Sequence, residues 1–283
     1  MKLIVQPEGG IGPILTAISR ATQAIDIVIF RLDCRSVTRS LEAAVRRGVQ
    51  VRAMIARKHR GRSRDLRKLE RRLLRAGVVL SRTAGDLVRY HGKMMIVDGR
   101  VLHVYGFNYT RRDYLSRSFG IETTDPALVR QAQHLFDADA ARRPYRGDSE
   151  DLVVSPINSR ERLAAFISGA RRQLLIYDPR VSDTALHRLI RERADAGVDV
   201  RIIGKIRHLR SPLNVQKYPG FRLHVRAIIR DGRRAFVGSQ SLGPVELDRR
   251  REVGVIVRNA AIVRRMQAIF ERDWRQTPAA RQS

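Results

Sequence analysis

Two histidines, each followed two positions later by a basic residue, are the side chains whose types and spacing could do chemistry. One pair is His91 and Lys93, and the other is His224 and Arg226. A neutral imidazole can serve as a nucleophile or a base near pH 7, while Lys or Arg neutralises the non-bridging oxygens of a phosphate. This combination suits attack on a phosphodiester. Because the cations are already part of the protein, we expect no metal and no other cofactor.

Two such pairs facing one pocket could divide the steps of a phosphoryl transfer. One histidine attacks phosphorus and forms a phosphohistidine, while the other, protonated, gives a proton to the leaving oxygen. The roles then exchange when water or an alcohol resolves the intermediate. The pattern therefore predicts a single active site that both pairs share.

An Asp-Gly dipeptide follows each pair and predicts how it is positioned. Asp98-Gly99 and Asp231-Gly232 supply the positive φ angles of a two-residue hairpin turn between apolar runs. Side chains two apart on a strand point to the same face, so each histidine should project together with its basic neighbour. Asp-Gly turns are common in their own right, which favours a structural role for both aspartates.

An internal repeat places the two pairs in equivalent positions. Residues 17–55 align with residues 166–204 at a constant shift of 149, so that Gly48 meets Gly197. Each copy reads as an amphipathic helix, an apolar strand, a second helix and a β-branched strand. Strand, helix and strand in that order imply a parallel, right-handed βαβ unit, and hence an α/β fold.

The histidine segments align at a smaller shift of 133, because the first copy carries an insertion around RKHRGRSRDLRKLERRLLR. A boundary near Glu150, in a Pro-, Arg- and Gly-containing stretch, divides the chain into two similar units, residues 1–150 and 151–283. In the insertion, Leu66, Leu69 and Leu73 form one face of a basic helix. That pattern docks on a core at least as often as it lies on a membrane or on nucleic acid.

The octapeptide H-G-K-M-M-I-V-D, from His91 to Asp98, resembles the HxKxxxxD signature of the phospholipase D superfamily, and the second copy is similar in the form HxRxxxxD. The resemblance covers nearly the whole chain. It implies two pseudo-symmetric α/β lobes, each a mixed sheet flanked by helices, that share one interfacial active site. By this resemblance His91 and His224 are nucleophile and acid/base, and Lys93 and Arg226 bind phosphate.

The resemblance extends to side chains downstream of each motif. The family's G-S-x-N element aligns with residues 105–108 and 238–241. An acidic residue that bonds an active-site imidazole and fixes its tautomer follows at a similar distance in each half. The supporting residues implied are Asn108, Ser239, Ser241, Glu122 and Glu252, together with Asp98 and Asp231 from the motifs themselves.

The sequence departs from the family pattern at three positions. Arg226 stands where Lys is expected and keeps the charge with a different geometry, Tyr105 occupies a Gly position, and Ser241 occupies an Asn position. Losses in both halves are compatible with activity at a shared site, and equally with a slowed enzyme or a binding remnant. Because the first copy keeps both the Lys and the Asn, we predict that His91 is the nucleophile.

The other potentially reactive side chains carry no comparable signal. Cys34 is the single cysteine, which excludes an internal disulfide and a cysteine zinc site, agrees with a reducing compartment and favours a small core residue. The remaining histidines lack a paired partner and are interpreted as bystanders: His59, His103, His134, His187 and His208.

The charge balance points to a polyanionic partner. The chain has 56 Lys+Arg against 28 Asp+Glu, a formal net charge of +28. Such a field attracts nucleic acid, anionic lipid headgroups or acidic proteins without choosing among them, and an arginine excess can also reflect genomic base composition. Aromatic residues make up only 6% of the sequence and are scattered, whereas single-strand binders interleave them with basic residues. We therefore expect an anionic phospholipid or membrane surface as the partner.

The apolar runs are too short for a membrane span, and the amino-terminal MKLIVQPEGG does not read as a signal peptide. We accordingly expect a cytoplasmic protein, free or peripheral at the inner membrane face. Three function classes stay open: a phospholipase D or phosphatidyltransferase, a metal-independent nuclease, and a non-catalytic polyanion-binding protein. The first is favoured by the paucity of aromatic side chains, although a cardiolipin synthase-like enzyme usually carries a membrane span. The sequence leaves the oligomeric state undetermined.

Overall fold

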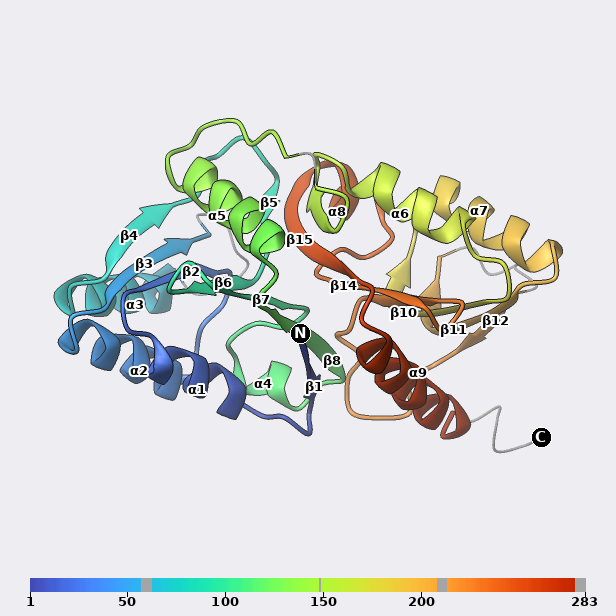
Figure 1. Cartoon of the computed structure of the whole chain (residues 1–283), viewed down its shortest axis with the longest axis horizontal. Helices are drawn as coiled ribbons and strands as arrows, with labels where there is room; N and C mark the ends of the chain where they lie inside the picture. The colour runs from blue at the N-terminus through green and yellow to red at the C-terminus, as the bar shows by residue number, and fades with distance from the viewer. Residues whose placement is uncertain (57–62, 148, 208–212, 278–283) are drawn as a thin grey trace.

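Two mixed β-sheets, one built mainly from each half of the chain, lie side by side with helices covering both faces of each sheet (Figure 1). The computed structural model describes residues 1–56, 63–147, 149–207 and 213–277. The arrangement confirms the predicted α/β architecture of two similar lobes. The division at residue 150 stays a prediction about sequence units.

The first half contributes a seven-stranded sheet with the strand order β1-β8-β7-β6-β2-β3-β4. Its strands β2 and β3 are parallel and are connected through α2, as the predicted βαβ unit requires. The elements of this half are β1 (Lys2–Gln6), α1 (Gly12–Arg20), β2 (Ala24–Ile29), α2 (Arg35–Arg46), β3 (Gln50–Ile55), α3 (Ser63–Arg75), β4 (Val79–Arg82), β5 (Arg89–Tyr90), β6 (Met94–Val97), β7 (Val101–Tyr105), α4 (Arg111–Tyr114), β8 (Ser118–Thr123) and α5 (Pro126–Ala140).

The second half repeats this plan. Its sheet has the order β12-β11-β10-β13-β14-β15-β5, with β9 also paired to β15, and the parallel pair β10 and β11 is connected through α7. Its elements are β9 (Leu152–Ser155), α6 (Ser159–Ser168), β10 (Gln173–Val181), α7 (Thr184–Asp195), β11 (Asp199–Ile206), β12 (Asn214–Gln216), β13 (Ala227–Arg230), β14 (Arg234–Gly238), α8 (Pro244–Asp248), β15 (Arg250–Val257) and α9 (Ala260–Arg275).

The two Asp-Gly hairpins form with the predicted positive φ angles, but three residues, not the expected two, separate the paired strand ends Val97 and Val101, and Arg230 and Arg234. Asp98 and Gly99 have φ angles of 53° and 59°, and Asp231 and Gly232 have φ angles of 54° and 63°. Two successive residues with positive φ give a turn whose twist matches that of the flanking antiparallel strands. The hairpins β6–β7 and β13–β14 are thereby fixed in register.

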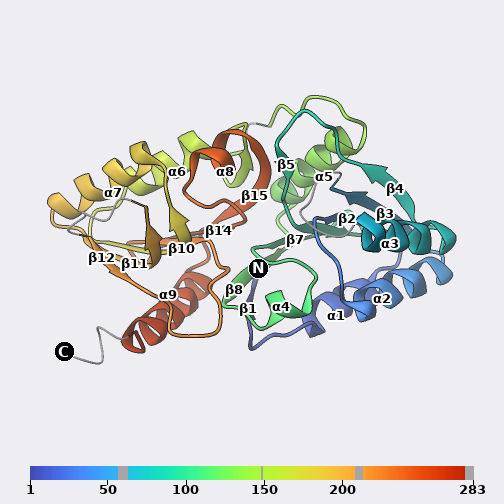
Figure 2. The same ribbon diagram turned by 180° about the vertical axis from the view of Figure 1, so that it is seen from behind.

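The lobes are joined through their sheets and their core. The short strand β5 of the first half pairs in parallel with β15 of the second, and the view from behind shows these two strands side by side at the junction (Figure 2). One continuous apolar cluster contains Leu3 and Phe119 from the first half together with Val257 and Phe270 from the second. This shared cluster, beside a separate apolar cluster within each half, therefore fixes the orientation of the two lobes.

The amphipathic helix of the insertion packs on the protein. In α3, Leu73 is fully buried, and Leu66 and Leu69 pack partly buried against the core of the first half. Its charged face forms ion pairs, including one from Arg72 to Glu42. The leucine face is thus used for docking on the core. Nowhere in the described ranges is a helix both long and apolar enough to cross a bilayer.

Candidate functional site

The two histidine segments lie at the junction of the lobes, each held by the backbone of the other half. The His91 amide donates to the Arg251 carbonyl over 2.7 Å, and the His224 amide donates to the Arg117 carbonyl over 3.0 Å. These segments precede β6 and β13 and are not part of either strand, which corrects the expectation that the histidines project from the hairpin strands themselves. The backbone pairs with the opposite lobe at His91 and His224, whereas the Lys93 and Arg226 carbonyls still accept from the second strand of their own hairpin.

Each arginine that offers its carbonyl is anchored by a buried, cross-lobe ion pair. Arg251 donates from Nε and Nη2 to the carboxylate of Asp139 in α5, at 3.0 Å for both contacts. Arg117 donates from Nε to Asp273 in α9 at 2.8 Å. The two pairs are equivalent under the repeat, because Arg117 and Arg251, like Asp139 and Asp273, are separated by 134 positions.

His91 lies between a carboxylate and an ammonium group. Its Nδ1 is 2.8 Å from Oε2 of Glu252, a fully buried residue of β15, and its Nε2 is 2.9 Å from Nζ of Lys93. Lys93 Nζ also lies 2.8 Å from Nδ1 and donates to the His91 carbonyl at 2.5 Å. A carboxylate can only accept, so we assign the ring proton to Nδ1, which leaves a lone pair on Nε2. The ring packs edge-on against Phe30, with 4.5 Å between centroids.

Burial and the surrounding cations keep this imidazole neutral. Burial lowers the pKa of His91 well below its usual value, and the charges of Lys93 and Arg226 lower it further. Burial likewise raises the pKa of Glu252, an effect that Lys93 opposes, and lowers the pKa of Lys93, which Glu252 opposes. His91, Lys93 and Glu252 therefore form a buried cluster in which the charge of each group depends on the other two.

His224 is oriented by a carboxylate from the opposite half. Its Nδ1 lies 2.7 Å from Oδ1 of Asp113, and Asp113 in turn accepts from Thr110 Oγ1 at 2.5 Å, Asn108 Nδ2 at 2.9 Å and Arg222 at 3.0 Å. Burial opposes ionisation of this carboxyl, but the hydrogen bonds from His224, Thr110 and Asn108 lower its pKa strongly. Asp113 is thus a firmly ionised partner for the imidazole.

The pKa of His224 is lowered to about 3. Burial is the main cause, and the charge of Arg226 adds to it, while Asp113 opposes the shift. The ring is consequently neutral in the resting site at pH 7. A bound anion that offsets Arg226 favours its protonation.

Arg226 is held by a small polar network of its own half. Its Nε donates to Ser241 Oγ at 3.0 Å and its Nη1 donates to the His224 carbonyl at 2.9 Å. The buried carboxyl of Asp178, within β10, accepts from the Leu242 amide at 2.6 Å. Burial raises the pKa of Asp178, and backbone hydrogen bonds and Arg226 oppose that rise. Ser241, at the Asn position of the family element, therefore orients the Arg226 guanidinium.

The two pairs are close enough to share one electrostatic environment. Arg226 is among the charges that lower the pKa of His91, and Asp113 is among those that raise the pKa of Lys93. The ends of the two hairpins also touch, since a Cβ on Gly106 would lie 3.2 Å from the Gly238 carbonyl oxygen. The structure thus brings the four motif side chains of both halves to the same junction.

The predicted supporting residues fall into three groups, the first of which lies at the site. Asn108 binds Asp113, and Ser241 binds Arg226. Ser239 accepts from the Val253 amide at 3.2 Å and hydrogen-bonds Glu252, which helps to keep that carboxyl ionised. These side chains therefore contact Asp113, Arg226 and Glu252, which in turn lie beside the motif histidines.

Glu122 forms the second group, and its predicted contact with a motif imidazole is wrong. Its carboxylate pairs with Lys2 at 2.8 Å and lies 4.0 Å from Nδ1 of His103, away from both motif histidines. The strand register explains the error. Gly120 of β8 and Gly254 of β15 occupy equivalent places, opposite Tyr105 and Gly238, so Ser118 and not Glu122 is the equivalent of Glu252.

Asp98 and Asp231 form the third group, and the structure places their carboxylates at the hairpin turns, bound to backbone amides. Each lies in a hairpin turn and binds backbone amides at the start of the neighbouring strand. The Asp98 carboxylate accepts from the amides of residues 22, 23 and 24 at 2.7–3.1 Å, and the Asp231 carboxylate accepts from those of residues 171, 172 and 173 at 2.7–3.2 Å. The favoured interpretation, a structural role at the turn, describes both.

Sequence reasoning missed two carboxylates. Asp113 follows Asn108 by five positions and Thr110 by three, and T-x-x-D is a helix-start pattern that could have drawn attention to it. Thr110 is indeed the N-cap of α4. Asp178 stands where the first copy has Ile29, directly after the apolar run Leu174–Tyr177, a signal visible in the repeat.

The other histidines do not join this site where the structure describes them. His134 packs its ring against Tyr145, and His103 lies on β7 beside Glu122. His59 and His208 lie outside the described residues. Within residues 1–56, 63–147, 149–207 and 213–277, no group of three or more His, Cys, Asp or Glu side chains is arranged to hold a metal ion.

Comparison with known proteins identifies the architecture. Two solved structures match nearly the whole chain: a polyphosphate kinase from Porphyromonas gingivalis, with a TM-score of 0.79, 19% identity and 95% of this chain covered, and a phosphatidylserine synthase from Haemophilus influenzae Rd KW20, with a TM-score of 0.72, 10% identity and 97% covered. The chain spans 49% of the kinase chain and 86% of the synthase chain. Both share the two-lobed fold.

A third structure, the phospholipase D family member Nuc from Salmonella typhimurium, matches 52% of this chain at 24% identity, covering 99% of its own, with a TM-score of 0.45. No curated protein matches the sequence. The family model described as "Cardiolipin synthase, PLD-like domain" matches residues 14–140 and 163–274, one segment in each half. The chain therefore belongs to the phospholipase D superfamily.

Proposed function

We propose that the protein is a metal-independent phosphodiesterase of phospholipase D type, which hydrolyses or transfers phosphatidyl groups through a phosphohistidine. One observation carries the proposal. Each motif imidazole lies beside a basic side chain of its own half and within 2.8 Å of a buried carboxylate from the other half. A neutral nucleophile, an acid/base and two fixed cations at one junction are the groups that transfer of a phosphoryl centre requires.

His91 is the proposed nucleophile. Its Nδ1–H donates a hydrogen bond to the Glu252 carboxylate, so the Nε2 lone pair is available for attack. Burial and the neighbouring cations hold its pKa low, which keeps the ring unprotonated at neutral pH. The same cations lie where the oxygens of an approaching phosphate need neutralisation.

His224 is the proposed acid/base. Its carboxylate partner, Asp113, stays ionised and so stabilises an imidazolium more than the buried Glu252 stabilises one at His91. When a phosphodiester offsets the charge of Arg226, the imidazole gains a proton that it can pass to the leaving oxygen.

The reaction then runs in two balanced steps. In the first, the His91 Nε2–P bond forms, the P–O bond to the leaving group breaks, and His224 supplies the proton to that oxygen. In the second, His224 removes a proton from water or an alcohol, the new oxygen attacks phosphorus, and the N–P bond breaks. Lys93 and Arg226 hold the non-bridging oxygens throughout.

Exposed apolar side chains at the approach to the site support a lipid substrate. Phe221 is 72% exposed, Leu115 is 63% exposed and Val88 is 41% exposed. Phe221 and Val88 precede the two histidine segments at equivalent places, and the chain near Leu115 is joined to that of Phe221 by the hydrogen bond from the Arg117 amide to the Arg222 carbonyl. Apolar side chains among arginines suit the interface of an anionic bilayer.

The closest rival is a nuclease that uses the same chemistry, since the net charge of +28 also suits a phosphate backbone. A non-catalytic polyanion-binding protein is the third candidate. The description of the matching family and the fold shared with a phosphatidylserine synthase add support to the lipid candidate.

The first experiment measures turnover in the presence of a chelator. Wild-type protein is offered bis(p-nitrophenyl) phosphate, vesicles of phosphatidylcholine or of cardiolipin, and labelled single- and double-stranded DNA. We expect turnover of the generic diester and headgroup release from vesicles. His91→Ala and His224→Ala should each abolish both activities, while His134→Ala, which alters a histidine of α5, should not.

The outcomes separate the three candidates. Unchanged turnover in both motif variants removes the mechanism. Strand cleavage without headgroup release replaces the lipid candidate with the nuclease. Binding of vesicles or DNA with no product between pH 5 and 9 favours the non-catalytic protein. Trapping of a phosphorylated His91 by an alkaline quench of a His224→Ala reaction, under which the acid-labile N–P bond survives, would test the order of roles.

A further inference from the structure

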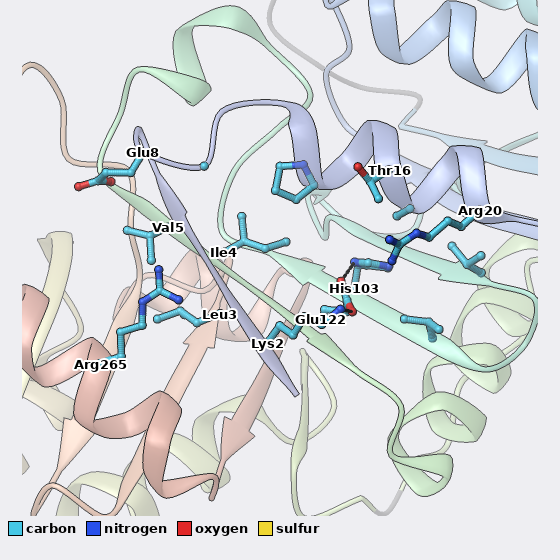
Figure 3. Close-up of a pocket in the computed structure, with 15 residues that line it drawn as sticks. Lys2, Leu3, Ile4, Val5, Glu8, Thr16, Arg20, His103, Glu122 and Arg265 are labelled. Carbon is cyan, nitrogen blue, oxygen red and sulfur yellow. Dashed lines mark ion pairs between the residues drawn. The ribbon is translucent and has the colours of Figure 1, made fainter.

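A second cavity lies apart from the motif side chains, where β1, α1 and α9 meet (Figure 3). Its volume is about 520 Å³, within the range of small-molecule sites, which is roughly 300–1,000 Å³. Much of its wall is apolar and comes from β1 and α1, including Ile4, Val5 and Ala17. None of the four motif side chains lines it, so the proposed chemistry does not account for it.

A buried histidine faces this cavity without a hydrogen bond at Nδ1. His103 of β7 is 1% exposed, and that nitrogen has no hydrogen-bond partner. The nearest acidic group is Glu122, opposite His103 on β8, with 4.0 Å between Nδ1 and Oε2. Burial lowers the pKa of His103 to about 4, so the ring is neutral at pH 7. A buried ring nitrogen without a hydrogen-bond partner is free to bond a ligand.

The second half shows that the fold does not need these polar side chains. Phe236 of β14 and Ile256 of β15 face each other in the same register as His103 and Glu122 and occupy the equivalent positions of the repeat. Both are buried and belong to the apolar core of their lobe. Replacing such a pair by His and Glu costs stability, because polar groups are transferred from water without full compensation. The requirements of folding therefore do not explain why the first half has His103 and Glu122 at these positions.

The charges around the cavity leave a cationic excess. Glu122 is paired with Lys2 at 2.8 Å, and Glu8 is paired with Arg117 at 2.8 Å and with Arg272 at 2.9 Å. Two further lining residues, Arg20 and Arg265, form no ion pair with the residues that the structure describes. Figure 3 shows Arg20 beside His103 at one end of the cavity and Arg265 beside Leu3 and Val5 at the other.

We propose that this cavity binds a small amphipathic anion, a single alkyl chain with a carboxylate or phosphate head group. The head group meets Arg20 and the unpaired nitrogen of His103, and the chain lies against the apolar wall formed by β1 and α1. Charge selects the head group, because the acidic side chains of the lining are already neutralised and the guanidinium groups are not. Cavity size limits the ligand to one short chain.

Isothermal titration calorimetry of the full chain tests this assignment. The probes are decanoate and octyl phosphate, each below its critical micelle concentration, with decanol and decyltrimethylammonium as neutral and cationic counterparts. We expect saturable binding of one or both anions and none of the cation. Arg20→Gln should weaken anion binding by about five- to tenfold, the loss of one charge contact of roughly 1 kcal/mol, and Arg265→Gln, at the other end of the cavity, should weaken it less. Arg264→Gln, on the same helix but outside the lining, is the matched control.

A double variant, His103→Phe with Glu122→Ile, fills the cavity with the side chains that the second half uses and should reduce binding at least tenfold. Circular dichroism checks that this double variant is folded. If it is unfolded, the Arg20 and Arg265 variants test whether the cavity binds the anion. No anion binding, equal binding of all four probes, or binding unchanged in every variant overturns the proposal. The site is independent of the catalytic one, so His91→Ala should bind both anions as the wild type does. The lower dissociation constant, for decanoate or for octyl phosphate, shows whether the cavity prefers a carboxylate or a phosphate head group.

Discussion

Arg251 and Asp139 join the two lobes directly behind the proposed nucleophile. The guanidinium of Arg251, in β15, contacts both oxygens of Asp139, in α5, at 3.0 Å, and the carbonyl of the same arginine accepts from the His91 amide at 2.7 Å. The side chain of one residue thus fixes the distance between the lobes while its backbone fixes the histidine. Stability and catalytic geometry depend on the same ion pair.

Removing one partner of this ion pair should lower both the stability of the protein and its turnover. Arg251→Met leaves the Asp139 carboxyl buried without its cation, so we expect a loss of about 3 kcal/mol in the free energy of unfolding. The His91 segment loses its anchor, and kcat should fall with little change in KM. Urea denaturation and steady-state kinetics measure the two effects.

Adding Asp139→Leu should recover most of the stability, and a double variant no more stable than Arg251→Met would contradict the account. Arg258→Met, at an exposed ion pair with Asp151, should cost at most about 1 kcal/mol.

The two carboxylates that contact the imidazoles should be required for turnover. Glu252→Gln and Asp113→Asn keep shape but remove the charge that fixes the tautomer, and we expect losses in kcat of about 10²- to 10⁴-fold. Glu122→Gln is the matched control, because its carboxylate pairs with Lys2 away from the motifs, and it should leave the kinetics unchanged. A loss in Glu122→Gln equal to that in Glu252→Gln would show that the register assigned to β8 is wrong.

Stability should fall in acid because His224 is buried in its neutral form. The pKa of His224 is about 3 in the folded protein, against an ordinary value of 6.5, so the unfolded chain binds more protons between these two values. The stabilising contribution is present above pH 6.5 and is lost as the pH falls through this window, by up to about 1.4 kcal/mol per pH unit. Burial shifts His91 in the same direction.

Urea unfolding at pH 7.5 and pH 5.0 measures this dependence. Between those values the wild type should lose roughly 2 kcal/mol more than His224→Gln, which lacks the titrating group. His134→Gln serves as the control, since it alters a histidine outside the site, and it should follow the wild type. An identical loss in wild type and His224→Gln would contradict the shifted pKa.

The motif aspartates should matter for folding and not for the chemical step. Asp98→Ala and Asp231→Ala each leave several backbone amides without their acceptor, and we expect each to lower the unfolding free energy by about 1–3 kcal/mol. Turnover per folded molecule should stay near the wild-type value, measured with the active fraction determined by unfolding. A drop of several orders of magnitude in kcat at full stability would instead place these carboxylates in the reaction.

Local patterns in the sequence were enough to predict the elements that carry the site. The Asp-Gly dipeptides dictate positive φ angles, and those angles fix the hairpins whatever surrounds them. The repeat itself predicted two equivalent βαβ units, because apolar periodicity depends on the chain alone. The placement of His91 with Lys93 and of His224 with Arg226 at a common junction followed from two copies of one motif, even though these side chains lie ahead of the strands.

The carboxylate partners could not be found in the same way. Which acidic residue reaches His91 depends on how β15 crosses to the other lobe, and which one reaches His224 depends on the helical turn at Thr110, where Asp113 is held. Distance along the sequence made Glu122 resemble Glu252, but strand pairing sets the true equivalence at Ser118. Register between strands is a tertiary property, and a shift of a few residues moves a side chain to the far end of its strand.

The sequence by itself determined the repeat, the hairpins and the identity of the four side chains proposed to meet phosphate, because each of these depends on neighbours close along the chain. Only the tertiary structure decided that Glu252 and Asp113 serve the histidine of the opposite half and that Arg251 and Arg117 hold those histidines by their backbones. Contacts between residues more than a hundred positions apart arise from the packing of two lobes on one core, which no local pattern encodes.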